Sequence, residues 1–180
     1  MRQEKLKWAE QPAINEFIKI ERTGYLGLTD GENPYVIPLN YVWLNDSIYI
    51  HGAAEGRKID IVQENSSACF TISRDLGTMT SPIPAKTDTA YKSVIVFGEI
   101  HIVKELKEAH EVMEHFLNKY VPGYYDQPLS KTHVEKYRSS LGSKTVVLKL
   151  TPRSISAKAN HYDEAVSFYP GRQVKMDLGK

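Results

Sequence analysis

The chain has 180 residues, which is enough for one domain that buries a substantial core. Its 23 Lys and Arg nearly balance its 22 Asp and Glu, so no strong basic field favours nucleic acid and no acidic tail is present. The single cysteine, Cys69, excludes an internal disulfide, and no apolar run has the length of a membrane span or the core of a signal peptide. We therefore expect a cytoplasmic protein with no membrane partner and no nucleic-acid partner.

The first third of the chain predicts a short amphipathic helix followed by an antiparallel meander. Gly24 is expected to end the helix, and Asp-Gly-Glu-Asn at 30–33 is a strong turn signal. Pro38 cannot donate to a strand ladder, which places its strand at a sheet edge or at a bulge. The expected helix covers residues 12–21, and the expected strands cover residues 25–29, 34–44 and 47–51.

The stretch at 49–60 combines the end of a strand, two glycines and two adjacent cations, Arg57 and Lys58, at the start of an expected helix over 55–64. A helix start has free N–H groups and a partial positive charge, so it favours an anion. A guanidinium and an ammonium beside it add affinity for phosphate. The residues predict a phosphate-binding corner; the alternative is a basic pair on a solvated helix face.

The second half of the chain adds strands and a long amphipathic helix. Residues 74–90 are expected to be a long loop, either a lid over a binding site or a plain surface loop. Gly98 lies inside the longest strand and suggests a bulge or bend of the kind that closes a barrel. The expected strands are 68–73, 91–103 and 145–151 continued to 158, and the expected helices are 105–120 and 131–141.

Catalytic and metal motifs are few. His110 and His115 are five residues apart and point in different directions on a helix, unlike the four-residue spacing of a zinc helix, so we expect no metal site. Cys69 lies inside a strand without a neighbouring cation, which fits a small buried side chain better than a nucleophile. No dinucleotide-binding, Walker or Ser-His-Asp pattern occurs.

About six strands, three helices and no β-α-β alternation favour an α+β, mainly β fold, an antiparallel six-stranded barrel with flanking helices. We expect one domain over residues 1–158. Residues 159–180 have no clear pattern and are expected to form a tail that packs on the body or on a partner subunit.

Four segments together carry a resemblance to a known family. These segments, residues 41–43, 51–60, 68–72 and 91–98, resemble the flavin-binding split-barrel superfamily of pyridoxamine 5′-phosphate oxidase, and more closely its nitroimidazole-resistance (Nim-type) branch. The resemblance covers residues 12–158 and is most specific in His-Gly-Ala-Ala-Glu-Gly-Arg-Lys and Tyr-Lys-Ser-Val. It implies a split-barrel homodimer with one FMN at each of two subunit interfaces, near residues 91–102 and 35–43.

The resemblance also implies roles for individual residues. Arg57 and Lys58 would hold the FMN phosphate, and Ser93, with Lys92 nearby, would bind the phosphate or the flavin. The remaining implied contacts are backbone groups along the pyrimidine edge of the flavin and two side chains that line its cavity. The first group is Pro38, Leu39 and Asn40, and the second is Ile50 and His51.

The resemblance implies an FMN-dependent oxidoreductase that reduces small electron-poor substrates such as nitroaromatics, with a reduced nicotinamide as a possible donor. His51 is the candidate proton donor; the alternative is that it only shapes the turn before Arg57. No C-terminal Trp and Arg signature follows residue 150, so oxidation of pyridoxamine phosphate is not expected. The competing hypothesis is a flavin- or haem-binding protein without turnover, a sensor or a store.

Overall fold

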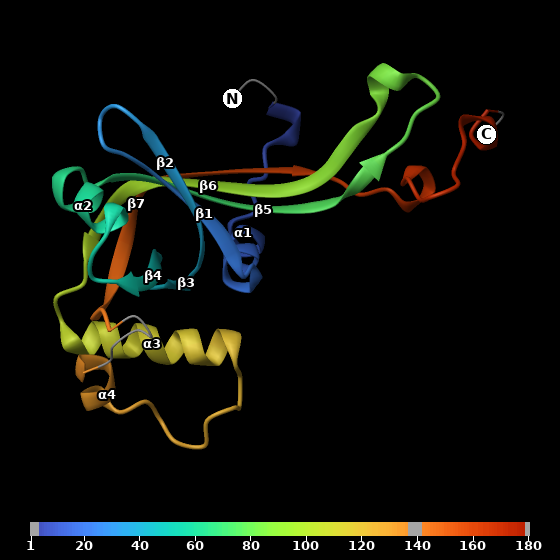
Figure 1. Ribbon diagram of the computed structural model, residues 1–180. Helices are drawn as coiled ribbons and strands as arrows, with labels where there is room; N and C mark the ends of the chain where they lie inside the picture. Colours follow the sequence, from blue (N-terminus) through green and yellow to red (C-terminus); the bar gives the residue numbers. More distant parts are fainter. Residues whose placement is uncertain (1–3, 137–141, 179–180) are drawn as a thin grey trace.

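The computed structural model describes residues 4–136 and 142–178, and its seven strands form one antiparallel sheet (Figure 1). The order across the sheet is β2-β1-β5-β6-β7-β4-β3. The fold is α+β, as predicted. The strands are β1 (Thr23–Thr29), β2 (Pro34–Asn40), β3 (Val42–Leu44), β4 (Ser47–Ala53), β5 (Ser67–Met79), β6 (Asp88–Ile102) and β7 (Thr145–Asn160).

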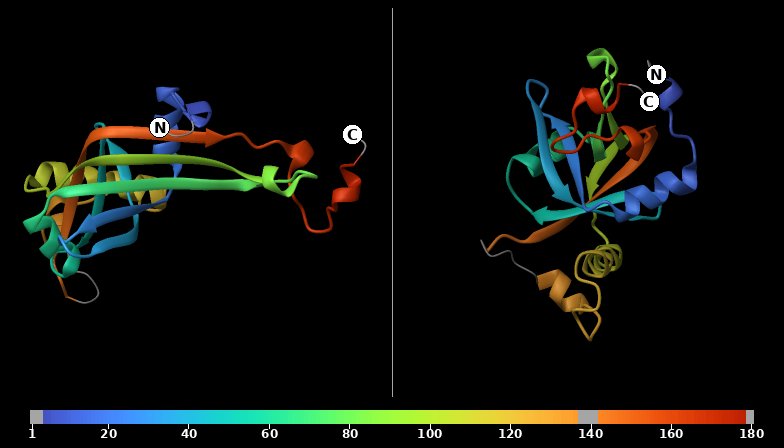
Figure 2. Two further views of the ribbon diagram at one scale, coloured as in Figure 1. Left: turned by 90° about the horizontal axis from the view of Figure 1, so that it is seen from above. Right: turned by 90° about the vertical axis from the view of Figure 1, so that its right-hand side faces the viewer.

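The sheet has to curl because its two outermost strands, β2 and β3, are consecutive in the chain and only Tyr41 separates them. In a flat sheet, six inter-strand spacings of about 4.8 Å would hold these strands about 29 Å apart. The end-on view in Figure 2 shows the sheet curled into a barrel. The barrel is split, since β2 and β3 do not pair with each other.

Tyr41 explains why the single strand expected over 34–44 is two strands, so that the sheet has seven strands rather than six. Its backbone N–H donates to the Tyr120 hydroxyl at 2.9 Å, and its carbonyl accepts from Lys119 Nζ at 3.0 Å. Its hydroxyl donates to the Ile18 carbonyl at 2.7 Å, and its side chain is fully buried. Because helix α3 (Leu106–Tyr120) satisfies these backbone groups, Tyr41 needs no ladder partner.

The prediction of a long loop over residues 74–90 is wrong. Strand β5 runs to Met79 and β6 starts at Asp88, so only residues 80–87, with a 3-10 turn at Pro84–Lys86, remain as a hairpin tip. The polar residues 74–79 and 88–90 nevertheless belong to strands. Strand β6 pairs with β5 on one side and with β7 on the other, so tertiary pairing overrides local propensity. The three strands extend beyond the barrel as an arm (Figure 1).

Three local expectations can be compared with the structure. Strand β2 lies at the sheet edge, as Pro38 predicted. The register between β6 and β7 shifts between Phe97 and Gly98, which confirms the predicted bulge; a Cβ on Gly98 would collide with the Thr151 carbonyl. Gly24 does not end the first helix: α1 (Gln11–Ile20) ends earlier, and Gly24 lies in β1, where the Phe70 ring occupies the space of a Cβ.

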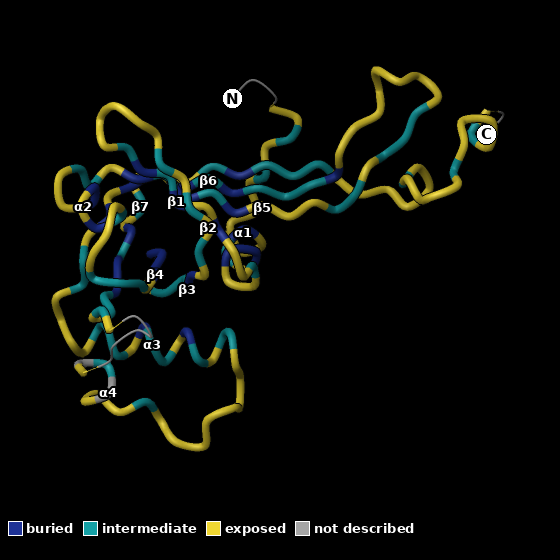
Figure 3. The backbone as a smooth tube through the Cα atoms, viewed as in Figure 1, coloured by how far each residue is buried: buried dark blue, intermediate teal, exposed yellow. Residues whose placement is uncertain are grey.

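Two apolar clusters hold the fold together. The first fills the barrel and includes Ile18, Leu26, Phe70 and Val94, each fully buried, and the inner face of α1 covers it. Burying one such side chain contributes about 1.5–3 kcal/mol. The second lies between α3 and the outer face of β3, β4 and β7. Figure 3 shows that the buried residues gather in the barrel, whereas the far end of the arm is largely exposed.

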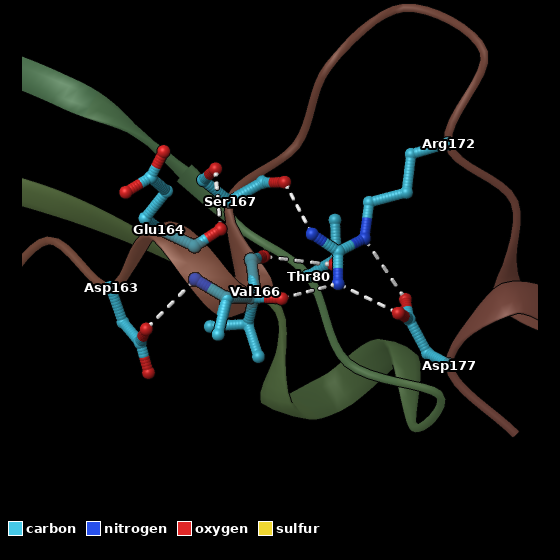
Figure 4. Close-up of polar contacts among 8 residues, drawn as sticks. Thr80, Asp163, Glu164, Val166, Ser167, Arg172 and Asp177 are labelled. Carbon is cyan, nitrogen blue, oxygen red and sulfur yellow. Dashed lines mark hydrogen bonds and ion pairs between the residues drawn. The ribbon is translucent and has the colours of Figure 1, made fainter. Parts of the chain in front are cut away.

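The C-terminal tail follows the arm of its own chain. The Thr80 N–H donates to the Val166 carbonyl, and the Phe168 N–H donates to the Thr78 carbonyl, both at 2.8 Å. Arg172 closes the tail on itself: its guanidinium donates to both Asp177 carboxylate oxygens and to the carbonyls of Ser167 and Ala165 (Figure 4). Whether a partner subunit also contacts the tail stays a prediction.

Two further helices complete the described chain, α2 (Arg57–Glu64) and α4 (Lys131–Lys136). The helix expected over 131–141 is confirmed in its first half, and residues 137–141 lie outside the described residues. None of the helices in the described part of the chain has the length and apolar composition of a membrane span.

Candidate functional site

The corner between β4 and α2 is the candidate anion site. Gly52 still belongs to β4 and pairs with Val146, and the chain then turns through Gly56, whose φ of +97° favours glycine. The Gly56 carbonyl accepts the N–H groups of Ile59 and Asp60. The N–H groups of Arg57 and Lys58 therefore start the helix without an upstream helical acceptor, which is the arrangement that attracts an oxyanion.

Lys58 is the cation that this corner holds in place. An added Cβ at Gly52 would lie 2.5 Å from Lys58 Nζ, so the glycine makes room for the ammonium group. The side chain is partly buried, and desolvation lowers the pKa of Lys58 below its ordinary value. Within residues 4–136 and 142–178, no carboxylate forms an ion pair with Lys58. An ammonium in this state gains from any anion that reaches it.

Arg57 is held differently, by groups from the β1–β2 turn. Its guanidinium donates to Asp30 Oδ2 at 3.1 Å and lies 4.8 Å from the centroid of the Tyr35 ring. The N–H groups of Asn33 and Glu32, and then Arg57, lower the pKa of Asp30. Because the Arg57 side chain is 53% exposed, solvent screens this pair, and another anion can replace Asp30.

Ile50 and His51 are neighbours that face opposite sides of β4. Ile50 is buried in the barrel core, whereas the His51 ring meets the Phe116 ring of α3 edge to face, with centroids 4.6 Å apart. His51 as a whole remains exposed, but desolvation, and then the charge of Lys58, lower its pKa. The imidazole is therefore neutral at neutral pH, and it lies in the electrostatic field of the candidate anion site.

The remaining predicted residues lie elsewhere on the sheet. Pro38, Leu39 and Asn40 are on the outer strand β2, with Pro38 and Asn40 exposed. Lys92 and Ser93 are on β6 where the arm begins, and Lys92 Nζ lies 5.1 Å from the centroid of the Trp8 ring.

One chain does not bring Ser93 and Lys58 together. Ser93 pairs with Lys158 of β7, and Gly52, beside Lys58, pairs with Val146 of the same strand. These β7 partners are twelve positions apart, about 40 Å along the strand at about 3.3 Å per residue. Even a bent strand leaves this separation far larger than one phosphate group. A ligand that contacts both sets would need a second copy of the chain.

The histidines of α3 have local partners. His110 Nε2 lies 2.5 Å from the Leu129 carbonyl, and His115 Nδ1 lies 2.9 Å from the Glu111 carbonyl. In the part of the chain that the structure describes, no three or more His, Cys, Asp or Glu side chains gather as a metal site would require.

Three residues of the corner were missed by sequence reasoning. Asp30 and Tyr35 hold Arg57, and Phe116 packs on His51. Asp30 had been interpreted only as a turn residue, and Phe116 only as part of the apolar stripe of a helix. Nothing in the local sequence indicates these contacts, because each joins elements far apart in the chain.

Comparison with solved structures identifies the fold class as the split barrel. A flavocytochrome, Anf3, from Azotobacter vinelandii has a TM-score of 0.75 at 19% identity, over 92% of this chain and 76% of that one. A proposed 5-nitroimidazole antibiotic resistance protein from Bacteroides thetaiotaomicron has a TM-score of 0.67 at 23% identity, over 85% and 86%. An FAD and haem binding protein from Mycobacterium smegmatis has a TM-score of 0.70 at 14% identity, over 87% and 74%.

The sequence identifies the family. The family described as pyridoxamine 5′-phosphate oxidase matches residues 10–159, which is most of the chain and nearly the whole barrel. The chain belongs to the pyridoxamine 5′-phosphate oxidase family. No curated protein matches it.

Proposed function

We propose that this protein is an FMN-dependent reductase whose flavin phosphate binds at the corner between β4 and α2. The observation that carries the proposal is the Lys58 ammonium, partly buried beside Gly52 and without a carboxylate ion-pair partner among the described residues. A phosphate group would supply that partner. It would also accept from the free N–H groups at the start of α2.

The residues at this corner fit a phosphomonoester. Lys58 would contribute a short, desolvated ion pair, and Arg57 would exchange its weak pair with Asp30 for the phosphate. The flavin ring would lie toward the free edge of β2, where Pro38, Leu39 and Asn40 offer backbone groups, as the family resemblance implies.

We propose a homodimer because the set of residues is divided within one chain. The partner copy would bring Lys92 and Ser93 to a flavin whose phosphate is held by Lys58. In a monomer these residues lie at separate positions on the sheet, so the site would be incomplete. Sedimentation of the flavin-loaded protein should give a dimer; a monomer with one flavin per chain would contradict this arrangement.

The substrate class is that of the Nim-type branch: small nitro compounds, reduced at the expense of a reduced nicotinamide. The structural similarity to the proposed 5-nitroimidazole resistance protein supports this choice. FMN, when bound, supplies the transfer of electrons. The protein's own residues bind the phosphate, orient the ring and hold a proton.

His51 is the residue that would hold this proton. The charge of Lys58 is one cause of the low pKa of His51, so an anion bound at Lys58 would raise that pKa towards its ordinary range. An imidazole whose pKa rises when the phosphate is bound would carry a proton more often in the loaded protein and could protonate a reducing nitro group. NMR titration of His51 with and without inorganic phosphate should show the rise. An unchanged pKa would remove this coupling.

Two measurements test the function. The purified protein should be yellow, with the absorption of bound FMN, and should oxidise a reduced nicotinamide when metronidazole is added. In His51→Ala, turnover per bound flavin should fall about a hundredfold, the lower range of general acid–base assistance. If His51 only shapes the turn, the variant should lose FMN while turnover per bound flavin stays the same.

The second candidate is a flavin- or haem-binding protein without turnover. It is favoured by the names of two structurally similar proteins, a flavocytochrome and an FAD and haem binding protein. A Soret band in the purified protein, together with no nicotinamide oxidation, would support this alternative over the reductase.

A further inference from the structure

A cleft of about 560 Å³ is lined by residues of α1, β3 and α3. Strand β3 contacts both helices, whose positions are labelled in Figure 1. The cleft has a volume in the range of small-molecule sites, about 300–1,000 Å³. It lies apart from the β4–α2 corner, because Lys58 packs at the end of β4 whereas the cleft is at the β3–β4 turn. No role assigned so far uses its residues.

The cleft combines apolar residues of β3 with polar and basic side chains from the two helices. Lys19 and Asn15 come from α1, and Asn118 and Lys119 come from α3, so donors from both helices line the cleft. His115 of α3 also lines it. One acid, Asp46, lies at the exposed rim. Among the residues that the structure describes, neither lysine has a carboxylate ion-pair partner.

The existing hydrogen bonds leave donor capacity on Asn15 and Lys119. The Asn15 side-chain oxygen already accepts from Gln11 Nε2 at 2.8 Å, which leaves its amide N–H groups for a ligand. Because a carbonyl can only accept, the 2.9 Å contact from His115 Nδ1 to the Glu111 carbonyl places the proton on Nδ1, so Nε2 of the neutral ring is an acceptor. Lys119 uses one N–H for the Tyr41 carbonyl at 3.0 Å, and two remain.

Lys119 also has a reason to accept an anion. Its ammonium lies 4.1 Å from the centroid of the Tyr41 ring. Burial, and then the charge of Arg22, lower its pKa to about 8, and the charge of Glu21 offsets only part of this shift. Trp43 is partly exposed, packs against the barrel cluster and lines the same cleft as Lys19 and Lys119, so it can offer an apolar ring surface to a ligand. Surplus donors around an aromatic surface match a flat ligand that is rich in acceptors.

We infer that this cleft binds a small planar organic anion, with its ring on Trp43 and its carboxylate or phosphate between Lys19 and Lys119. The site goes beyond the proposed flavin chemistry. A ligand in the cleft would influence the barrel through Tyr41, because Lys119 donates to the Tyr41 carbonyl at the junction of β2 and β3.

The test is an NMR titration of the full, flavin-loaded chain with sodium benzoate, phenyl phosphate and neutral benzyl alcohol at constant ionic strength. The readout is the indole N–H signal of Trp43, assigned with the Trp8→Phe variant. We expect a saturable shift with benzoate or phenyl phosphate and none with benzyl alcohol. The tighter of the two anions identifies the charged group of the natural ligand.

Three lysine variants make the test specific. Lys19→Met and Lys119→Met should each weaken anion binding about tenfold or more, the scale of one charge-assisted hydrogen bond. Lys107→Met, an exposed lysine of α3 outside the cleft, should not change it. Should Lys119→Met fail to fold, Lys19→Met decides alone, because its side chain is exposed.

The outcomes separate this site from the flavin site. No saturable Trp43 shift, or equal affinity in the Lys19, Lys119 and Lys107 variants, would overturn the inference. Equal binding of benzyl alcohol would do the same. In Lys58→Met the Trp43 response should persist even when the FMN content falls.

Discussion

Two lysines beside the same strand, β4, have pKa values shifted in opposite directions. Lys149 pairs with Tyr49 across the β4–β7 ladder, and its ammonium donates to Glu108 at 2.9 Å, while the Tyr49 hydroxyl donates to the same oxygen at 2.7 Å. The hydrogen bond to Glu108 raises the pKa of Lys149. Lys58, by contrast, has a lowered pKa because it is desolvated without a carboxylate partner in the described chain.

The difference separates a structural ion pair from the proposed phosphate-binding group. Lys149 and Glu108 join α3 to the barrel, so their charges are already compensated. A desolvated cation without this compensation lowers the stability of the empty protein, and an anionic ligand can recover that cost. Which lysine belongs to the site is therefore decided by its partner rather than by its position along the strand.

Exchanging each lysine for methionine gives the largest expected effect. Lys58→Met should weaken FMN binding by about 1.5–3 kcal/mol, about 10- to 150-fold, because one charge-assisted bond to phosphate is lost. Lys149→Met should leave FMN affinity unchanged. It should lower the free energy of unfolding by about 1 kcal/mol or less, since Lys149 and Glu108 are each about one-third exposed. Flavin fluorescence titration and urea unfolding measure the two effects; the opposite pattern would refute the distinction.

Gly52→Ala tests the same site without removing a charge. The new Cβ would lie 2.5 Å from Lys58 Nζ, and because this is the end of a flexible side chain, Lys58 should move rather than the backbone. FMN affinity should fall about tenfold, near the low end of one charged hydrogen bond, with little loss of stability. Gly27→Ala is the matched control, since its Cβ would meet the Cys69 carbonyl at an ordinary 3.5 Å. An unchanged FMN affinity in Gly52→Ala would argue against Lys58 as a phosphate ligand.

The pH dependence of FMN affinity should show a smaller effect. Lys58 binds phosphate as the ammonium ion, and in the empty protein its pKa lies below 10.5. As pH rises through this lowered pKa, Lys58 of the free protein loses its proton. FMN affinity should therefore begin to decline at pH values lower than 10.5. In Lys58→Met this part of the decline should disappear, while Lys149→Met should keep it, because the pKa of Lys149 is raised. Fluorescence titrations at stepped pH measure the slopes.

The general fold and the basic corner could be predicted from sequence because they depend on local signals. Pro38 identified a strand that does not pair on both sides, Gly98 identified a bulge, and the pattern around Arg57-Lys58 identified the start of a helix with two cations. Such signals need only the chemistry of neighbouring residues.

The features that were missed depend on partners far away in the chain. The arm formed because β6 pairs with both β5 and β7, although residues 74–79 have a loop-like composition. Tyr41 interrupts a strand because Tyr120 and Lys119 satisfy its backbone. Arg57 turned toward Asp30 and Tyr35 rather than alongside Lys58 for the same kind of reason. Spacing within the sequence carries no information on these pairings.

The central claim is that Lys58 and the start of α2 bind the flavin through its phosphate. The most direct measurement compares the dissociation constants of FMN and riboflavin for the wild-type protein and for Lys58→Met. Our account predicts that the wild-type protein prefers FMN about a hundredfold or more, through charge-assisted bonds of about 1.5–3 kcal/mol each. It also predicts that Lys58→Met loses most of this preference while binding riboflavin unchanged. Equal affinities of the wild-type protein for the two flavins would contradict it.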